Sequence, residues 1–118
     1  MRNIRVAIWG FGAMGGGIAK VLLEKEGVEI SGVCDLNPER AGKSIYTLLG
    51  VERGERTDVT ITEDIDAALP ERSADVCIVA TDSFTRDVYP KLLRVLKCGV
   101  NAISTAEEMS YPAAKEPL

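Results

Sequence analysis

Apolar and mixed segments alternate along this chain, and most of them end at a turn residue. Short apolar runs, typical of strands in a parallel sheet, occupy residues 4–9, 28–34, 59–61, 75–80 and 100–104. Between them, apolar side chains recur at helical spacing in segments that follow residues 12, 37, 61 and 83. This alternation of strand and helix predicts an α/β fold, a single domain with a doubly wound parallel sheet in three layers.

Two helix starts have clear local signals. Residues 37–39 read Asn-Pro-Glu, an N-cap followed by a first-turn proline and carboxylate, so we expect a helix from there to about Leu49. Thr105 and Glu108 have capping-box spacing, which predicts another helix after the last strand. Glu107 and Glu108 are adjacent on that helix and point about 100° apart, so they suit capping better than a paired catalytic role.

A glycine pattern follows the first apolar run directly. Gly10 allows a sharp turn out of the strand, Gly12 leaves room for a pyrophosphate, and Gly15 lets the next helix pack closely. Unpaired amides at the start of that helix, together with its dipole, bind phosphates without a lysine. An ordinary strand-to-helix turn is the alternative interpretation. The spacing G-x-G-x-x-G makes candidate cofactor-binding residues of Gly10, Phe11, Gly12, Ala13, Met14 and Gly15.

An acidic residue closes the second apolar run. Asp35 follows the third glycine by 20 positions, where a carboxylate accepts hydrogen bonds from the adenosine ribose hydroxyls. Strand, glycine turn, helix and acid together predict a Rossmann-type dinucleotide-binding domain. The acid favours NAD, because a 2′-phosphate would meet a negative charge. Arg40 and Lys43 either reach toward a 2′-phosphate or lie on a solvated helix face, so NADP stays an alternative and Arg40 a candidate binding residue.

Residues that follow the later strands are further candidates, because ligands of such sheets bind beyond the carboxyl ends of the strands. Ala80, Thr81 and Asp82 close the strand at 75–80 and could line the path to the nicotinamide. Asp82 or Ser83 could equally cap the following helix. Thr105 follows the last strand in the same way and completes the set of candidate cofactor-binding residues.

Composition restricts the class of protein. The chain has 118 residues, of which 46% are hydrophobic and 27% charged, enough for one globular core but not for two. Its net charge is −4, with basic residues interspersed among acids, which argues against a nucleic-acid partner. The first apolar run is too short for an export signal or a membrane span, so we expect no membrane association and a cytoplasmic location.

Composition also limits the available chemistry. The sequence has no histidine, the commonest metal ligand and the commonest general base near neutral pH. Cys34, Cys77 and Cys98 are widely spaced, so we expect small buried hydrophobic residues and not a metal site. Trp9, the only tryptophan, is expected in the core and not at a ligand. We therefore assign no catalytic and no metal-binding residue in this chain.

Two stretches of the sequence resemble a known family. Residues 6–19, with residues 27–30 and Asp35, form the first, and residues 101–112 (Asn-Ala-Ile-Ser-Thr-Ala-Glu-Glu-Met-Ser-Tyr-Pro) form the second. They resemble the N-terminal domain of the dihydrodipicolinate reductase-like dehydrogenases, in particular members that act on 2,4-diaminopentanoate. Many NAD(P) enzymes share the first stretch, so the second carries most of the specificity.

The resemblance implies an NAD(P)-dependent oxidoreductase that deaminates 2,4-diaminopentanoate to 2-amino-4-oxopentanoate and ammonium. It implies pyrophosphate binding at residues 10–15, adenosine ribose binding at Asp35, and a nicotinamide ribose near residues 80–82. Family members continue for about two more domain lengths, which hold the substrate pocket, the catalytic groups and the interface of a homodimer. We therefore expect these 118 residues to be a fragment that lacks the substrate domain, binds the cofactor and is inactive alone.

Two other functions remain open. The cofactor domain of a dihydrodipicolinate reductase or of a homoserine dehydrogenase shares the glycine pattern, but the region around Glu107 and Glu108 argues against both. A stand-alone nucleotide-sensing module without chemistry of its own is the second alternative. The sequence shows neither a DNA-binding extension nor a basic patch in its support.

Overall fold

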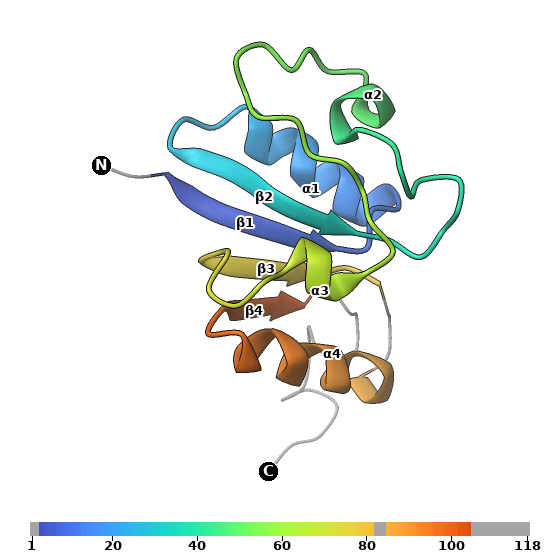
Figure 1. Ribbon diagram of the computed structural model, residues 1–118, viewed down its shortest axis with the longest axis vertical. Coiled ribbons are helices and arrows are strands. Elements are labelled where there is room, and N and C mark those ends of the chain that lie inside the picture. Colours follow the sequence, from blue (N-terminus) through green and yellow to red (C-terminus); the bar gives the residue numbers. More distant parts are fainter. Residues whose placement is uncertain (1–2, 82–84, 105–118) are drawn as a thin grey trace, which may run out of the picture.

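A parallel sheet of four strands runs through the described part of the chain. This computed structural model describes residues 3–81 and 85–104, with the backbone alone at 85–88. The strands are β1 (Ile4–Trp9), β2 (Val28–Cys34), β3 (Val76–Val79) and β4 (Asn101–Ser104), in the spatial order β2-β1-β3-β4 (Figure 1). Each neighbouring pair is parallel. The strand order therefore reverses between β1 and β3, and the carboxyl ends of these strands form the switch point where such sheets bind ligands.

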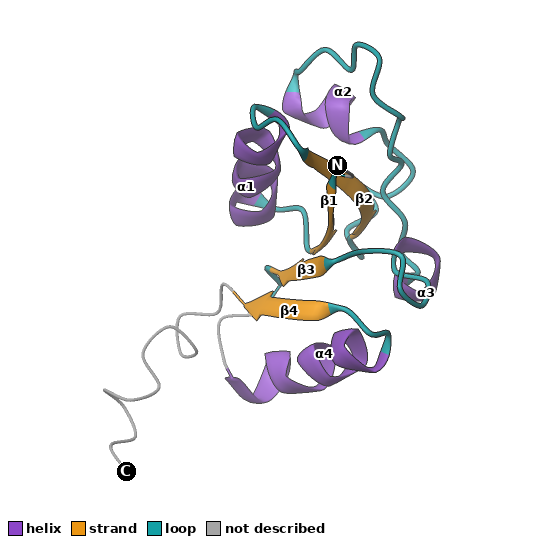
Figure 2. Cartoon of the chain, turned by 90° about the vertical axis from the view of Figure 1, so that its left-hand side faces the viewer, coloured by secondary structure: helices purple, strands orange, loops and turns teal. Residues whose placement is uncertain are grey.

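Helices cover both faces of this sheet. α1 (Ala13–Leu23) and α2 (Ile45–Leu49) pack on one face, whereas α3 (Ile65–Ala68) and α4 (Thr85–Lys97) pack on the other (Figure 2). Each face has its own cluster of buried apolar side chains. The predicted three-layered, Rossmann-type α/β fold is confirmed for the described residues.

Strand β1 supplies side chains to both clusters because successive residues of a strand point to opposite faces. Val6 and Ile8 join the cluster beneath α1 and α2, whereas Ala7 and Trp9 join the one beneath α4. Val6, Ala7 and Ile8 are each at most 3% exposed. The apolar run from Val6 to Trp9 in the sequence thus reflects a central parallel strand covered on both sides.

The helix predicted from residue 38 to residue 49 is wrong over its first half. Gly42 has a φ of +85°, which ends any helix, and its N–H donates to the carbonyl of Ile61 at 2.7 Å. Helix α2 begins only after Ser44, whose hydroxyl accepts the Tyr46 N–H at 3.3 Å. A hydrogen bond to a segment far along the chain has overridden the local helix-start signal.

The strand predicted at 59–61 is also wrong. Thr62 makes an isolated parallel bridge with Cys34, and Thr60 makes an isolated antiparallel bridge with Ser44. A hollow of about 430 Å³ lies between β2 and this segment. The segment therefore touches the outer edge of β2 at one point without extending the sheet.

Some predicted features lie outside the described residues. They are Asp82, Ser83, Thr105 and the helix that was to contain Glu107 and Glu108. Within residues 3–81 and 85–104, no helix has the length and apolar character needed to cross a membrane.

Candidate functional site

The first glycine of the pattern lies in a turn that admits no side chain. Gly10 has a φ of +103°, and its N–H still donates to the carbonyl of Cys34 at 2.7 Å. A Cβ at Gly10 would lie 2.6 Å from Cγ2 of Thr81 and 2.9 Å from the carbonyl of Ala80. Both the backbone conformation and the close approach of the segment after β3 therefore require glycine.

The third glycine brings α1 against this turn. A Cβ at Gly15 would lie 1.9 Å from the carbonyl oxygen of Gly10 and 3.4 Å from Cγ2 of Ile8. The predicted close packing is thus seen, with the turn itself as the main contact. This packing sets where the amino end of α1 lies relative to the sheet.

The second glycine leaves the amino end of α1 open. Gly12 is the N-cap, and no side chain among the described residues caps the helix there. The first helical hydrogen bond runs from the Gly16 N–H to the Gly12 carbonyl at 2.8 Å, so the amides of Ala13 and Met14 have no partner within the helix. Among the described residues beyond its own chain neighbours, a Cβ at Gly12 would approach nothing closer than the guanidinium of Arg40, at 3.9 Å. The space that a pyrophosphate needs beside these amides is therefore present.

Asp35 joins the glycine turn to the loop after β2. It is only 8% exposed, and its Oδ2 accepts the Phe11 N–H at 2.6 Å while its Oδ1 accepts the Asn37 N–H at 2.8 Å. The guanidinium of Arg40 donates to Oδ2 at 3.3 Å. These donors stabilise a buried carboxylate that would otherwise be costly. Since a carboxylate has about four acceptor positions, Oδ1 can still accept a hydrogen bond from a ligand hydroxyl.

Arg40 lies at the mouth of the site and not on a helix face. Arg40 belongs to a turn before α2, at a place where the sequence predicted a helix. The side chain lines two adjacent hollows, both of which also include Gly12. Lys43, by contrast, is exposed and lines neither hollow. Of the two basic residues that the sequence left open, the structure brings only Arg40 to the glycine turn.

A cleft of about 360 Å³ opens at the carboxyl ends of the strands, where these groups meet. Three residues that line it, Trp9, Leu36 and Lys91, were not assigned from the sequence. Trp9 packs on the core beneath α4, as predicted, but its remaining surface faces the cleft. The cleft brings together six predicted residues: Gly10, Gly12, Asp35, Arg40, Ala80 and Thr81.

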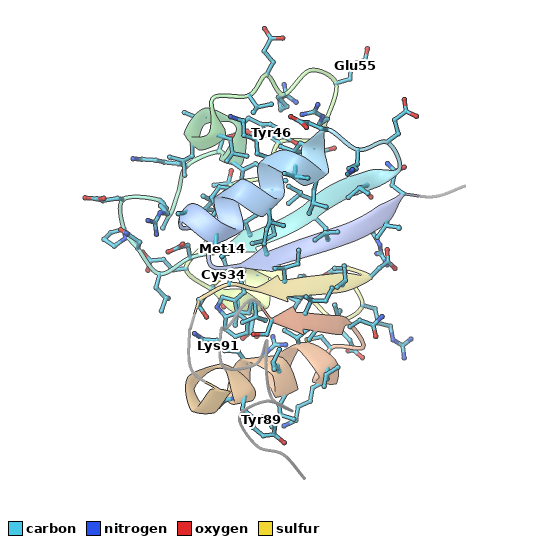
Figure 3. All side chains as sticks on the ribbon, turned by 180° about the vertical axis from the view of Figure 1, so that it is seen from behind. Met14, Cys34, Tyr46, Glu55, Tyr89 and Lys91 are labelled. Atoms are coloured by element: carbon cyan, nitrogen blue, oxygen red, sulfur yellow. The ribbon has the colours of Figure 1, made fainter. Side chains whose placement is uncertain are left out.

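Lys91 comes from α4, far from the glycine pattern in the sequence. Its Nζ donates to Oγ1 of Thr81 at 2.7 Å and lies 5.7 Å from the centre of the Trp9 ring. Figure 3 shows Lys91 and Cys34 near the carboxyl end of the sheet, with Met14 on the α1 side. The sequence gives no signal for Lys91, because its place at the cleft depends on how α4 packs against the end of β1.

Three predicted residues lie beside the cleft. The side chain of Phe11 is 4% exposed and belongs to the core, and its N–H is already bound to Asp35. Phe11 therefore has no backbone donor left for a phosphate. Met14 is 58% exposed and, with Ala13, lines a shallow apolar groove on the outside of α1. What these two residues offer a ligand is the amides of the first helical turn.

The three cysteines are buried and free, as predicted. Burial raises the pKa of the Cys77 thiol from its usual 9.0 to about 12. Burial, and then the charges of Asp35 and Asp64, raise the pKa of Cys34 to about 11. Neither thiol is a nucleophile near neutral pH, although Cys34 lies next to the cleft.

Comparison with known proteins places these features in a family. Residues 4–106 match the family described as "Dihydrodipicolinate reductase, N-terminus". The chain belongs to this family. The match includes the glycine turn, Asp35 and the segment after β3. The predicted family is therefore confirmed.

Individual relatives agree with this assignment. The chain is 44% identical to a 2,4-diaminopentanoate dehydrogenase of Acetoanaerobium sticklandii over 117 residues, 99% of this chain and 33% of that protein. The structure of an amine dehydrogenase from Mycobacterium smegmatis matches with a TM-score of 0.81 and 33% identity, over 97% of this chain and 33% of the other. GenD2 from gentamicin A biosynthesis, in complex with NAD, matches with a TM-score of 0.66 and 26% identity, over 88% and 27%. The chain thus spans about a third of the length of these relatives.

Proposed function

We propose that the cleft at the carboxyl ends of β1, β2 and β3 binds the adenosine diphosphate half of NAD. The observation that carries this proposal is the hydrogen bond from the Phe11 N–H to Asp35, at 2.6 Å. It joins the glycine turn to the acid, so the groups proposed to bind phosphate and ribose already lie side by side without a ligand. Such preorganisation reduces the ordering cost of binding.

The pyrophosphate lies over the amino end of α1 in this proposal. The amides of Ala13 and Met14 supply donors, and the absence of a side chain at Gly12 supplies the room. Helix amides and the helix dipole favour an anion there. The ribose hydroxyls donate to Asp35, and the adenine lies between Leu36 and the segment at Ala80, both of which line the cleft.

Asp35 and Arg40 decide between the two cofactors in opposite directions. The Asp35 carboxylate favours free ribose hydroxyls and therefore NAD. Arg40 is 3.3 Å from that carboxylate and its side chain is about a third exposed, at 35%, so it can turn toward a 2′-phosphate. We infer that NAD is the preferred cofactor and that NADP is accepted more weakly.

For the whole protein we propose oxidative deamination of 2,4-diaminopentanoate, because the relative with 44% identity bears that name. The bound nicotinamide would accept a hydride from C4 of the substrate, which leaves an imine at that carbon. Water then replaces the nitrogen, which leaves 2-amino-4-oxopentanoate and ammonium. In this proposal the residues of this chain hold and orient the cofactor. The substrate site, the catalytic groups, the predicted homodimer and the predicted cytoplasmic location are proposals for the whole protein.

Calorimetric titration of this chain with NADH and NADPH tests the cofactor proposal. We expect saturable binding of both, tighter for NADH. In a separate assay with NAD⁺ as the oxidant we expect no oxidation of 2,4-diaminopentanoate, because one wall of an active site cannot hold a substrate against the nicotinamide. Absence of saturable binding to a folded sample contradicts the cofactor site. Measurable amine oxidation by these 118 residues contradicts the prediction that the chain is inactive alone.

A further inference from the structure

Lys91 is an element of the cleft that the glycine pattern does not include. It lies in the middle of α4 (Thr85–Lys97), on the opposite face of the sheet from α1. Its side chain nevertheless reaches the cleft that Gly10, Gly12 and Asp35 line from the other side. The cleft therefore has a basic residue on each wall, Arg40 on one and Lys91 on the other.

Contacts with two described residues, Thr81 and Trp9, hold the ammonium group of Lys91 at the cleft. Its Nζ donates to the Thr81 hydroxyl at 2.7 Å, and it lies over the Trp9 ring at 5.7 Å from the centroid, within the range of a cation–π interaction. Thr81 is itself positioned by the glycine turn, since its Cγ2 occupies the space that a Cβ on Gly10 would need. The position of Lys91 is thus connected through Thr81 to the turn that receives the pyrophosphate.

The charges around Lys91 indicate what it can bind. Arg40 forms an ion pair with Asp35, and Lys91 brings a second positive charge from the α4 side. That charge is also felt at the carboxyl end of β2, where it lowers the pKa of the Cys34 thiol and so opposes the effect of burial, which raises it. An ammonium group is a donor only, with a concentrated charge. In a nicotinamide dinucleotide the groups that carry negative charge are the phosphates.

We propose that Lys91 is a cofactor-binding residue that donates from α4 to a phosphate of the dinucleotide. This proposal rests on the cofactor site proposed above. The phosphate belongs either to the pyrophosphate, which NAD and NADP share, or to the 2′-phosphate, which only NADP has. The site thereby gains a cationic contact that a G-x-G-x-x-G motif alone does not provide.

The test compares Lys91→Met with Lys97→Met in titrations with NADH and NADPH. Methionine keeps an apolar stem over Trp9 and removes the charge, and Lys97 is an exposed lysine in the last turn of the same helix. We expect Lys91→Met to weaken binding about tenfold, the loss of one hydrogen bond to a charged group. We expect Lys91→Arg to retain most of the affinity and Lys97→Met to retain all of it.

The cofactors distinguish the two sources of phosphate. A loss with both NADH and NADPH supports the pyrophosphate, and a loss with NADPH alone supports the 2′-phosphate. Unchanged affinity for both cofactors in Lys91→Met overturns the proposal, and so does an equal loss in Lys97→Met. If the wild-type chain binds neither cofactor, the cofactor site itself is wrong. Urea unfolding of wild type and Lys91→Met without ligand is the control for folding. If Lys91→Met loses affinity only because less of it is folded, the proposal is also overturned.

Discussion

At the scale of single residues, Gly15 has the strictest steric requirement in the glycine turn. A Cβ there would lie 1.9 Å from the carbonyl oxygen of Gly10, whereas a Cβ at Gly17 would meet nothing within 4 Å. We expect Gly15→Ala to lower the free energy of unfolding by about 1–3 kcal/mol or more, because backbone must shift. Gly17→Ala, two positions along the same helix, should raise it by about 0.5–1 kcal/mol. Urea unfolding without cofactor measures both, and equal effects of the two substitutions would contradict the packing described.

Asp35 permits a prediction about cofactor choice. Asp35→Asn removes the charge that we propose binds the ribose hydroxyls and that pairs with Arg40 at 3.3 Å. We expect NADH binding to weaken about tenfold or more and NADPH binding to weaken less, since Arg40 is released and a 2′-phosphate no longer meets a carboxylate. Glu39→Gln is the control, with the same charge change on an exposed residue nearby. Equal losses for the two cofactors would show that Asp35 acts only on the fold.

The Cys77 thiol links stability to alkaline pH. Burial raises its pKa from 9.0 to about 12 in the folded chain, so above pH 9 the unfolded chain releases a proton that the folded chain keeps. The free energy of unfolding should therefore fall as pH rises from 9 toward 12, by about 1.4 kcal/mol per pH unit for this thiol. Urea unfolding at several pH values, for wild type and Cys77→Ala, isolates the contribution. We expect a shallower decline in the variant, and parallel declines would rule out this linkage.

At the scale of elements, β2 contains a feature that its apolar pattern does not reveal. The register between β1 and β2 shifts after Val6, which pairs with Ile30, because Ala7 pairs with Gly32 and Ser31 is passed over. A Cβ at Gly32 would lie 2.0 Å from the carbonyl oxygen of Ala68 in α3. This irregularity therefore places a glycine beneath α3 and lets that short helix approach the strand closely.

We expect Gly32→Ala to separate α3 from the sheet and to lower the free energy of unfolding by about 1–3 kcal/mol or more. Ser31→Ala is a matched control, because Ser31 is exposed and adjacent, and its effect should stay within about 0.5 kcal/mol. Hydrogen exchange of the α3 amides in the two variants locates the effect. If both variants exchange alike, the contact between Gly32 and Ala68 does not hold α3 in place.

The elements also show what the sequence can and cannot predict. Strands β1, β2, β3 and β4 were predictable because each is a short apolar run between turn residues. The start of α2 was not, because Asn37 and Pro38 form a good local helix start, whereas the helix begins after Ser44. What decides between them is the hydrogen bond from Gly42 to Ile61, a contact between distant segments that local patterns do not contain.

At the scale of the whole molecule, one part of the candidate site could be predicted from the sequence and another part could not. The glycine turn, Asp35 and Ala80 could be placed together from the sequence, because a parallel sheet brings the carboxyl ends of its strands to one edge. Lys91 could not, since its position depends on how α4 is rotated over Trp9. The structure also gives Asp35 a second role, as an acceptor for the turn's own amide at Phe11.

The last prediction concerns cofactor binding and the stability of the whole domain. A ligand that binds only the folded chain at a hundred times its Kd adds about 2.7 kcal/mol to the free energy of unfolding, which for a domain of this size raises Tm by roughly 10 °C. Because the cleft is built around the groups proposed to bind phosphate and adenosine ribose, we expect ADP-ribose to give most of the shift that NADH gives. Nicotinamide mononucleotide, which lacks the adenosine half, should give little. A larger shift with the mononucleotide than with ADP-ribose, measured by differential scanning calorimetry, would reverse the assignment of the cleft.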